Sequence, residues 1–176
     1  MINMLQKMNL RDFDKMYALM KSSFPPDEYR PKAEQRTLFD DPRYCVYVMP
    51  DTEKNDIKAF IAVHNFKSFS YIEHFAVNPA YRCGGLGTQI LHEISAILPN
   101  PICLEAELPN SDIARRRIGF YERNGFFVND YEYIQPPISK GKNPIPLIIM
   151  TSVNGLTHEQ LNDIKETLYK FVYHVF

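Results

Sequence analysis

The sequence has few cysteines, no long apolar run and almost no net charge, and each shortage excludes a class of protein. Its three cysteines, Cys45, Cys83 and Cys103, are odd in number and widely spaced, which argues against a disulfide framework or a metal site and for free thiols in the cytoplasm. No apolar stretch reaches the roughly 18 residues of a membrane-spanning helix. The formal net charge of −1 argues against general binding to nucleic acids or anionic membranes.

The remaining composition is that of an ordinary globular protein. Of the 176 residues, 45% are apolar and 23% are charged, which suits one domain over residues 1–176 with a full hydrophobic core. No repeat, low-complexity tract or linker divides the chain. Charged residues stand too early in the first 16 residues for a signal peptide, so we expect a cytoplasmic protein.

The order of apolar patterns predicts an α+β fold, with a mostly antiparallel central sheet flanked by helices and an extra C-terminal helix outside a core at about 3–151. The expected elements are a strand at 4–8, helices at 10–21 and 32–39, strands at 44–50, 57–66 and 70–77, a helix from residue 86, a strand at 101–107, a helix at 113–123, strands at 126–133 and 146–151, and a helix at about 157–173.

A strand that runs into a cluster of glycines is the most informative part of the sequence. The alternating run at 70–77 leads through Pro79 and Arg82 to Gly84, Gly85 and Gly87, and a helical pattern begins at once. A glycine turn that opens a helix directs several backbone N–H groups to one point, where the helix dipole also favours negative charge. The segment therefore predicts a pyrophosphate-binding loop, with Arg82 as an added cation.

Three kinds of phosphate loop can be compared with this segment. The P-loop string Gly-x4-Gly-Lys-Ser/Thr does not occur. The dinucleotide fingerprint has an acid in its favour, since Glu105 and Glu107 lie about 20 residues on, but Ile90 stands where its third glycine belongs. The third pattern, Gln/Arg-x-x-Gly-x-Gly/Ala, matches residues 82–87 in full.

A second motif follows after one predicted strand, in the segment Ile113–Phe126, which ends in Tyr-Glu-Arg-Asn-Gly-Phe. Together the two motifs resemble those of the GNAT superfamily of acyl-CoA-dependent N-acyltransferases, over about residues 3–151. The resemblance implies that the loop binds the pyrophosphate of acetyl-CoA and that the preceding strand binds the pantetheine arm and the oxyanion. The residues implied are Phe75, Ala76, Val77, Arg82, Cys83, Gly84, Gly85, Leu86, Gly87 and Thr88.

The implied reaction, attack of an amine on a thioester, needs a base, oxyanion donors and an acid. Tyr121 lands where many members place a tyrosine beside the thioester sulfur, so it is the expected acid and a cofactor contact. Glu73 is the leading candidate for the base, on a strand face expected to hold Tyr71 and Phe75 as well. Glu105 and Glu107 are the alternatives, and proton removal through water, with no single base, is a third.

Acidic and aromatic residues favour a cationic acceptor. Asp27 and Glu28 lie in a Pro-rich segment that the resemblance makes a candidate substrate lid, and Glu105 and Glu107 share one strand face. Tyr133 and Gln135 belong to a Tyr-x-Gln-Pro run similar to one that lines the acceptor side in a subset of bacterial members. The arginines at 115–117 are candidates for the 3′-phosphate of CoA or for a solvated helix face.

We therefore expect an N-acetyltransferase that moves an acetyl group from acetyl-CoA to a primary amine of a small molecule or peptide, by direct attack in a ternary complex and without a metal. A CoA-binding sensor without turnover is the alternative. The apolar stripe and the terminal aromatic residues of the last helix predict that it packs on the domain or forms a homodimer contact.

Overall fold

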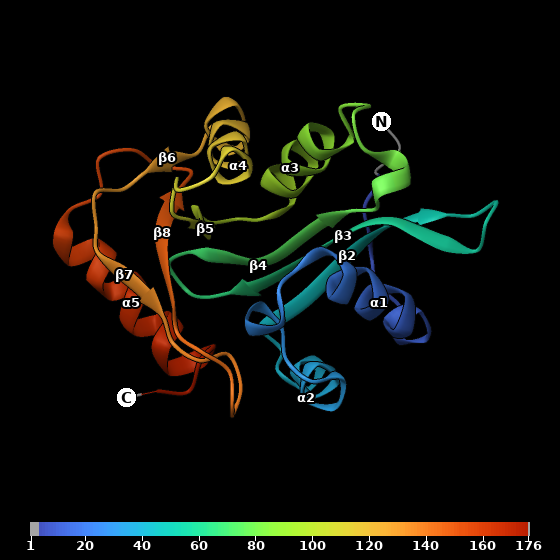
Figure 1. Cartoon of the computed structure of the whole chain (residues 1–176), viewed down its shortest axis with the longest axis horizontal. Helices are drawn as coiled ribbons and strands as arrows, with labels where there is room; N and C mark the ends of the chain where they lie inside the picture. Colours follow the sequence, from blue (N-terminus) through green and yellow to red (C-terminus); the bar gives the residue numbers. More distant parts are fainter. Residues whose placement is uncertain (1–3, 176) are drawn as a thin grey trace. The chain divides into compact units, whose positions relative to one another are not determined.

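The computed structural model describes residues 4–175 and divides the chain into two compact units. One unit contains the chain up to Phe24 together with Lys32–Ile102, and the other contains Pro25–Pro31 and the chain from Cys103 onward. Figure 1 shows the helices and strands of each. The predicted α+β class, with mostly antiparallel strands flanked by helices, is confirmed, whereas the single domain expected from length and composition stays a prediction.

The first unit is an antiparallel sheet with helices beside it. Its strands pair in the order β1-β2-β3-β4. Helix α1 packs on β3 and β4, and α3 lies on the other side of these strands (Figure 1). The elements are β1 (Gln6–Lys7), α1 (Phe13–Ser23), α2 (Lys32–Thr37), β2 (Tyr44–Asp51), β3 (Asp56–Asn65), β4 (Ser70–Val77) and α3 (Leu86–Ile97).

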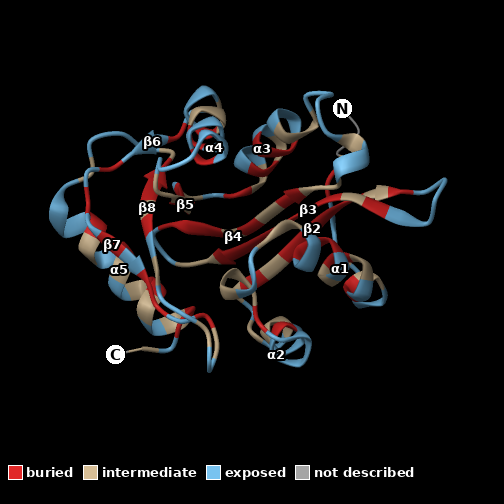
Figure 2. Ribbon diagram, viewed as in Figure 1, coloured by how far each residue is buried: buried red, intermediate tan, exposed pale blue. Residues whose placement is uncertain are grey.

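The core of this unit follows from the helical and strand periods of the sequence. Helix α1 buries Phe13, Met16 and Met20, which lie on one stripe, and α3 buries Ile90 and Ile94 in the same way. The middle of β3 is covered on both faces, since residues 59–63 have no exposed surface (Figure 2). A strand covered on both faces reads as a continuous apolar run, as residues 59–63 do.

The second unit is built around β8, which pairs antiparallel with β5 along one edge and with β6 and β7 along the other. A short 3-10 turn, η2 (Pro26–Glu28), belongs to this unit although it lies between α1 and α2 in the sequence. The other elements are β5 (Ile102–Glu107), α4 (Asp112–Arg123), β6 (Phe127–Val128), β7 (Tyr133–Gln135), β8 (Ile145–Thr151) and α5 (His158–Phe171).

The C-terminal helix packs within the second unit. Thr157 and Gln160 form a capping box at its start, and Leu161, Ile164 and Leu168 are buried. The Tyr169 hydroxyl donates to the Ile134 carbonyl at 2.5 Å. The structure thus supports packing on the domain, the first of the two predicted roles, while the homodimer contact stays a prediction.

The strand predicted at 126–133 is wrong as a single element. Between Val128 and Tyr133 the chain takes five steps, whereas their partners on β8, Met150 and Leu147, are three steps apart. The extra residues leave the ladder, and Asn129 bridges the gap, because its Nδ2 donates to the Ile149 carbonyl at 3.0 Å and to Thr151 Oγ1 at 3.0 Å. The side-chain amide adds to the backbone bond from the Asn129 N–H to the Ile149 carbonyl at 3.1 Å, an arrangement that strand propensity does not reveal.

Asn129→Ala should lower the free energy of unfolding by about 1–3 kcal/mol, because it removes the two buried side-chain hydrogen bonds to the Ile149 carbonyl and to Thr151 Oγ1. Chemical denaturation measures this loss directly. The matched control, Asn154→Ala at an exposed position, should change stability by less than about 0.5 kcal/mol. Equal effects of the two substitutions would contradict the bridging role of Asn129.

Candidate functional site

The glycine segment makes a left-handed turn at the start of α3. Strand β4 ends at Val77, a 3-10 turn covers Pro79–Tyr81, and Gly85 is the N-cap of α3 with φ +75°. The backbone N–H of Gln89 bonds to the Gly85 carbonyl at 3.1 Å. The N–H groups before that point are those that a helix start leaves without intrahelical partners, so the loop directs donors toward one place.

The backbone of the loop borders open space at two glycines. A Cβ atom added at Gly84 or Gly85 would meet no atom within 4 Å, so the backbone itself forms the surface there. Cys83 is exposed and has φ +68°, a left-handed conformation that favours glycine. Both features fit a loop that presents its backbone, and not its side chains, to a pyrophosphate.

Two side chains hold the chain segment that leads into this loop. Arg82 Nε donates to the Val77 carbonyl at 3.0 Å, which holds its guanidinium at the end of β4. The Tyr81 hydroxyl donates to the Asp51 carboxylate, and the ammonium groups of Lys54 and Lys58 lie 5.2 and 5.3 Å from the centre of the Tyr81 ring. The loop therefore starts from an anchored position beside the β2–β3 hairpin.

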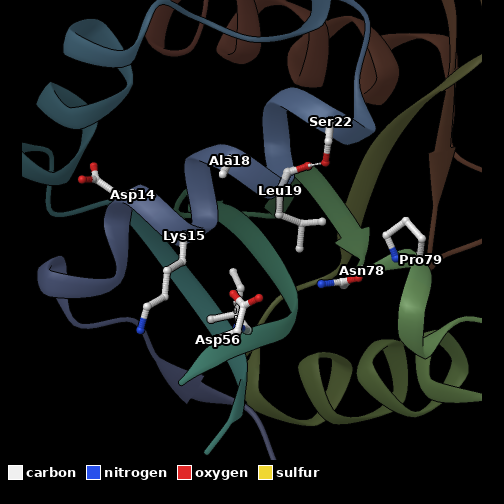
Figure 3. A pocket seen from close by; sticks show the side chains of 9 residues that line it. Asp14, Lys15, Ala18, Leu19, Ser22, Asp56, Asn78 and Pro79 are labelled. Atoms are coloured by element: carbon white, nitrogen blue, oxygen red, sulfur yellow. Dashed lines mark hydrogen bonds between the residues drawn. The ribbon is translucent and has the colours of Figure 1, made fainter. Parts of the chain in front are cut away.

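A pocket of about 500 Å³ lies beside the same approach segment. Figure 3 shows Leu19 and Ser22 of α1 near Asn78 and Pro79, which lead from β4 toward the glycines. No predicted catalytic residue lines it. The lining residues are Asp14, Lys15, Ala18, Leu19, Ser22, Asp56, Ile57, Asn78 and Pro79.

Glu73 lies in a β-bulge, which corrects the predicted strand face. Val63 pairs with Ile72 and Ala62 pairs with His74, so Glu73 stands between them as the extra residue. Beyond the bulge the alternation is shifted, and Phe75, opposite Ile61, lies on the other face from His74 and Tyr71. The predicted shared face of Tyr71, Glu73 and Phe75 is therefore wrong, because an inserted residue changes the parity of the strand.

The Glu73 carboxylate is deeply buried in the first unit. Its side chain is 2% exposed, and His64 Nε2 lies 3.1 Å from its Oε2. His74 Nδ1 lies 3.7 Å from the same oxygen, and the Phe24 ring packs edge-on against His74 at 4.9 Å. Glu73 is thus part of a packed polar cluster with two histidines, a pairing that sequence spacing did not indicate.

Tyr121 lies on α4 in the second unit and is buried between Phe120 and Phe126. Burial raises the pKa of Tyr121 to about 12, and the nearby Arg117 cation opposes part of that rise. No hydrogen bond of its hydroxyl is found among residues 4–175. The side chain is therefore a protonated hydroxyl without an acceptor in that part of the chain.

A group of charged residues near Tyr121 includes one that sequence reasoning did not single out as a base. Arg117 Nη1 donates to Glu107 Oε1 at 3.0 Å, and Glu28 of η2 faces this pair. Burial raises the pKa of Glu28 to about 7, the Glu107 carboxylate adds to the rise, and Arg117 opposes it. A carboxyl group with a pKa near 7 suits general-base chemistry at neutral pH.

Segment 25–31 is fastened to the β7–β8 loop of its own unit. Asn143 donates to both oxygens of Asp27, at 3.1 and 3.0 Å, and Lys142 Nζ donates to the Pro26 carbonyl at 2.6 Å. The amide donors of Asn143 lower the pKa of Asp27. The segment predicted as a substrate lid is therefore held by specific bonds that bring Glu28 to Glu107.

Glu105, the other predicted acid, is held by two tyrosines. The Tyr173 hydroxyl donates to its Oε2 at 2.8 Å, and the Tyr133 hydroxyl donates to its Oε1. Burial, followed by the charge of Glu105, raises the pKa of Tyr133 strongly. Tyr173 follows α5, so the C-terminal segment contributes to this part of the unit, which the short motifs did not predict.

Arg115, one of the arginines considered for the 3′-phosphate of CoA, bonds within its own part of the chain. Arg115 bonds to Asp112 at 2.5 Å and to the Pro109 carbonyl at 2.9 Å, which favours the helix-face interpretation over a phosphate contact.

The three cysteines are free thiols. Within residues 4–175 no set of three or more His, Cys, Asp or Glu side chains is arranged to hold a metal ion, and no helix there is long and apolar enough to cross a membrane.

Comparison with known proteins places this geometry in a family. The sequence model described as the acetyltransferase (GNAT) family matches residues 13–126. A protein of Bacteroides thetaiotaomicron assigned to the GNAT acetyltransferases is 34% identical, with 98% of this chain and 99% of that chain covered and a TM-score of 0.88. No curated protein matches the sequence.

Two further solved structures share the fold at low identity. The ribosomal-protein-S18-alanine N-acetyltransferase of Escherichia coli is 18% identical, with 88% of this chain and 96% of that chain covered and a TM-score of 0.61. An aminoglycoside 6′-N-acetyltransferase complexed with coenzyme A is 16% identical, with 88% and 100% covered and a TM-score of 0.58.

Proposed function

The chain belongs to the GNAT acetyltransferase family, and from this premise we propose that it transfers an acetyl group from acetyl-CoA to a primary amine in a ternary complex. The observation that carries the proposal is the strand, left-handed glycine turn and helix of residues 70–97, which forms an open anion cradle. The protein is an acyltransferase; the acceptor and the residue roles given below are proposals.

We assign the cofactor contacts to the first unit. The backbone of Gly84–Thr88 and the Arg82 guanidinium bind the pyrophosphate, and the end of β4 at Phe75–Val77 binds the pantetheine arm. When bound, acetyl-CoA supplies an activated thioester. The three free thiols fit a reducing compartment such as the cytoplasm.

Tyr121 acts as the donor at the leaving sulfur. With a pKa of about 12 its hydroxyl stays protonated at neutral pH. A phenol of that pKa is a weaker acid than an ordinary thiol, so we expect it to stabilise developing negative charge through a hydrogen bond more than to release its proton fully.

Two carboxylates compete for the role of base, Glu73 and Glu28. We favour Glu28, because its pKa of about 7 allows it to accept a proton at neutral pH and because it lies with Glu107 and Arg117 in the unit that holds Tyr121. Glu73, the base favoured by the sequence, has a carboxylate that is 2% exposed and bonded to His64. We assign Glu73 to a supporting role within β4, where it binds His64.

Acetyl-CoA should raise the melting temperature of the wild type, and Gly84→Glu should abolish that rise. A ligand at 100 times its dissociation constant adds about 2.7 kcal/mol, or roughly 5–10 °C for a chain of this size. A Cβ at Gly84 meets nothing within 4 Å and its φ is not left-handed, so a glutamate fits there without backbone strain and adds a negative charge to the loop. Asn154→Glu adds the same charge at an exposed site and should keep the rise. Stabilisation of Gly84→Glu by acetyl-CoA would remove the loop from the binding site.

Tyr121→Phe should lower kcat about 10- to 100-fold, the cost of losing one hydrogen bond to a charged group. The KM for acetyl-CoA should change little, because the bond strengthens only as charge develops on sulfur. Steady-state release of free thiol, with spermidine, lysine, kanamycin and a short peptide as amines, measures both constants. An unchanged kcat would rule out the donor assignment.

The pH profile of kcat/KM separates the two candidate bases. Glu28 accepts a proton only when ionised, so wild-type kcat/KM should rise with pH through about 7. Glu28→Gln should lose this rise and lower the plateau about 100-fold or more, whereas Glu73→Gln should keep the rise. The reverse pattern would give the role of base back to Glu73.

A further inference from the structure

Gln135 is a buried side chain whose donor has no partner. The residue is 5% exposed, and its Nε2 makes no hydrogen bond to any residue between 4 and 175. Buried side-chain nitrogens in folded proteins nearly always donate to something, so an exception calls for a physical explanation.

Other buried amide nitrogens in this chain do find acceptors. Gln35 Nε2 donates to the Tyr44 hydroxyl at 2.8 Å, and Asn129 Nδ2 donates to the Ile149 carbonyl at 3.0 Å. The chain therefore supplies acceptors where an amide is needed for folding. Gln135 Nε2 differs from these two nitrogens because no described residue supplies its acceptor, which leaves the donor available to a bound ligand.

Strand register places Gln135 next to the acidic group of the second unit. Glu107 and Tyr133 both pair with Leu147 from opposite edges of β8, so these three side chains share one face of the sheet. Gln135 pairs with Ile145, two residues further along β8, and lies on the same face one row away. Its amide thus neighbours the row that holds Glu107, the carboxylate that Glu28 faces.

The acidic residues and the Gln135 donor together select a particular kind of amine as the acceptor. The two carboxylates of Glu28 and Glu107 outnumber the single Arg117 cation beside them, so the group attracts an ammonium group and repels a ligand that carries its own carboxylate nearby. A buried N–H donor requires an acceptor atom on the ligand, which a simple alkyl polyamine does not have. Adjacent rows are about 6.6–7 Å apart, so the ammonium and the acceptor oxygen must be close within one small molecule.

Resting on the proposed acetyl transfer, we propose that Gln135 donates a hydrogen bond to a neutral carbonyl oxygen of the acceptor. The acceptor is then a primary amine with an adjacent amide, as in an amino acid amide or the N-terminal residue of a peptide. Gln135 determines this specificity, and Glu28 and Glu107 hold the ammonium.

The test compares matched amines on the full-length protein. Amino acid amides from glycinamide to phenylalaninamide are each paired with the amine in which a methyl group replaces the carboxamide, and with the free amino acid. The wild type should prefer at least one amide about tenfold in kcat/KM over both counterparts, the factor expected for one hydrogen bond. Equal or better rates with the methyl amines, with kanamycin or with free amino acids would overturn the inference.

Two variants separate specificity from folding. Gln135→Leu should reduce the amide preference to near one while the melting temperature stays the same or rises, because an unpaired buried donor is removed. Gln35→Leu, which removes an amide that has a partner, should lower the melting temperature and keep the preference. An unchanged preference in Gln135→Leu, or a fall in its melting temperature to match Gln35→Leu, would show that Gln135 is structural.

The same samples distinguish failure of this inference from failure of the proposed function. If acetyl-CoA raises the melting temperature of the wild type but no amide is preferred, the assignment of Gln135 is wrong and acetyl transfer stands. If acetyl-CoA produces no rise, the proposed function itself is contradicted.

Discussion

The left-handed backbone at Gly85 connects the segment after β4 to the start of α3, and the proposed cofactor site depends on that turn. The donors at the start of α3 point to one place because the chain reverses there within a few residues. Arg82 is held at the same place by the Val77 carbonyl, and Tyr81 is tied to the β2–β3 hairpin. A Cβ atom at Gly84 would meet no protein atom within 4 Å, so the protein leaves the space beside this backbone empty.

A second constraint is the attachment of segment 25–31 to the C-terminal half of the chain. Asp27, Pro26 and Arg30 bond to Asn143, Lys142 and the Val172 carbonyl. These bonds bring Glu28 to Glu107 and Arg117, and the resulting burial and charge raise the pKa of Glu28 to about 7. The base proposed for catalysis thus depends on a loop that is far from its partners in the sequence.

The fold and the glycine turn before α3 could be predicted from the sequence because their signals are local. The spacing of Phe13, Met16 and Met20 predicts the buried stripe of α1. The residues from Arg82 to Gly87 predict the glycine turn without reference to the rest of the chain. The bulge at Glu73 could not be predicted, because an inserted residue leaves no mark in a period-two pattern. The break at Asn129 depends on acceptors about 20 residues away.

The candidate site illustrates the same division between local and distant signals. Tyr121 was recognisable from its own motif, whereas the roles of Glu28 and Tyr173 come from contacts across 79 and 68 positions of the chain. The unpaired Nε2 of Gln135 can be recognised only when the burial and the hydrogen bonds of the residue are known together. Residues that act through distant partners are thus the ones that sequence reading misses.

A crystal structure of the complex with coenzyme A would show directly whether the glycine loop binds the pyrophosphate. We expect the pyrophosphate oxygens to lie within hydrogen-bonding distance, about 2.7–3.2 Å, of backbone nitrogens in residues 84–88, with the Arg82 guanidinium beside them. A pyrophosphate bound elsewhere, with the glycine turn facing only solvent, would contradict it.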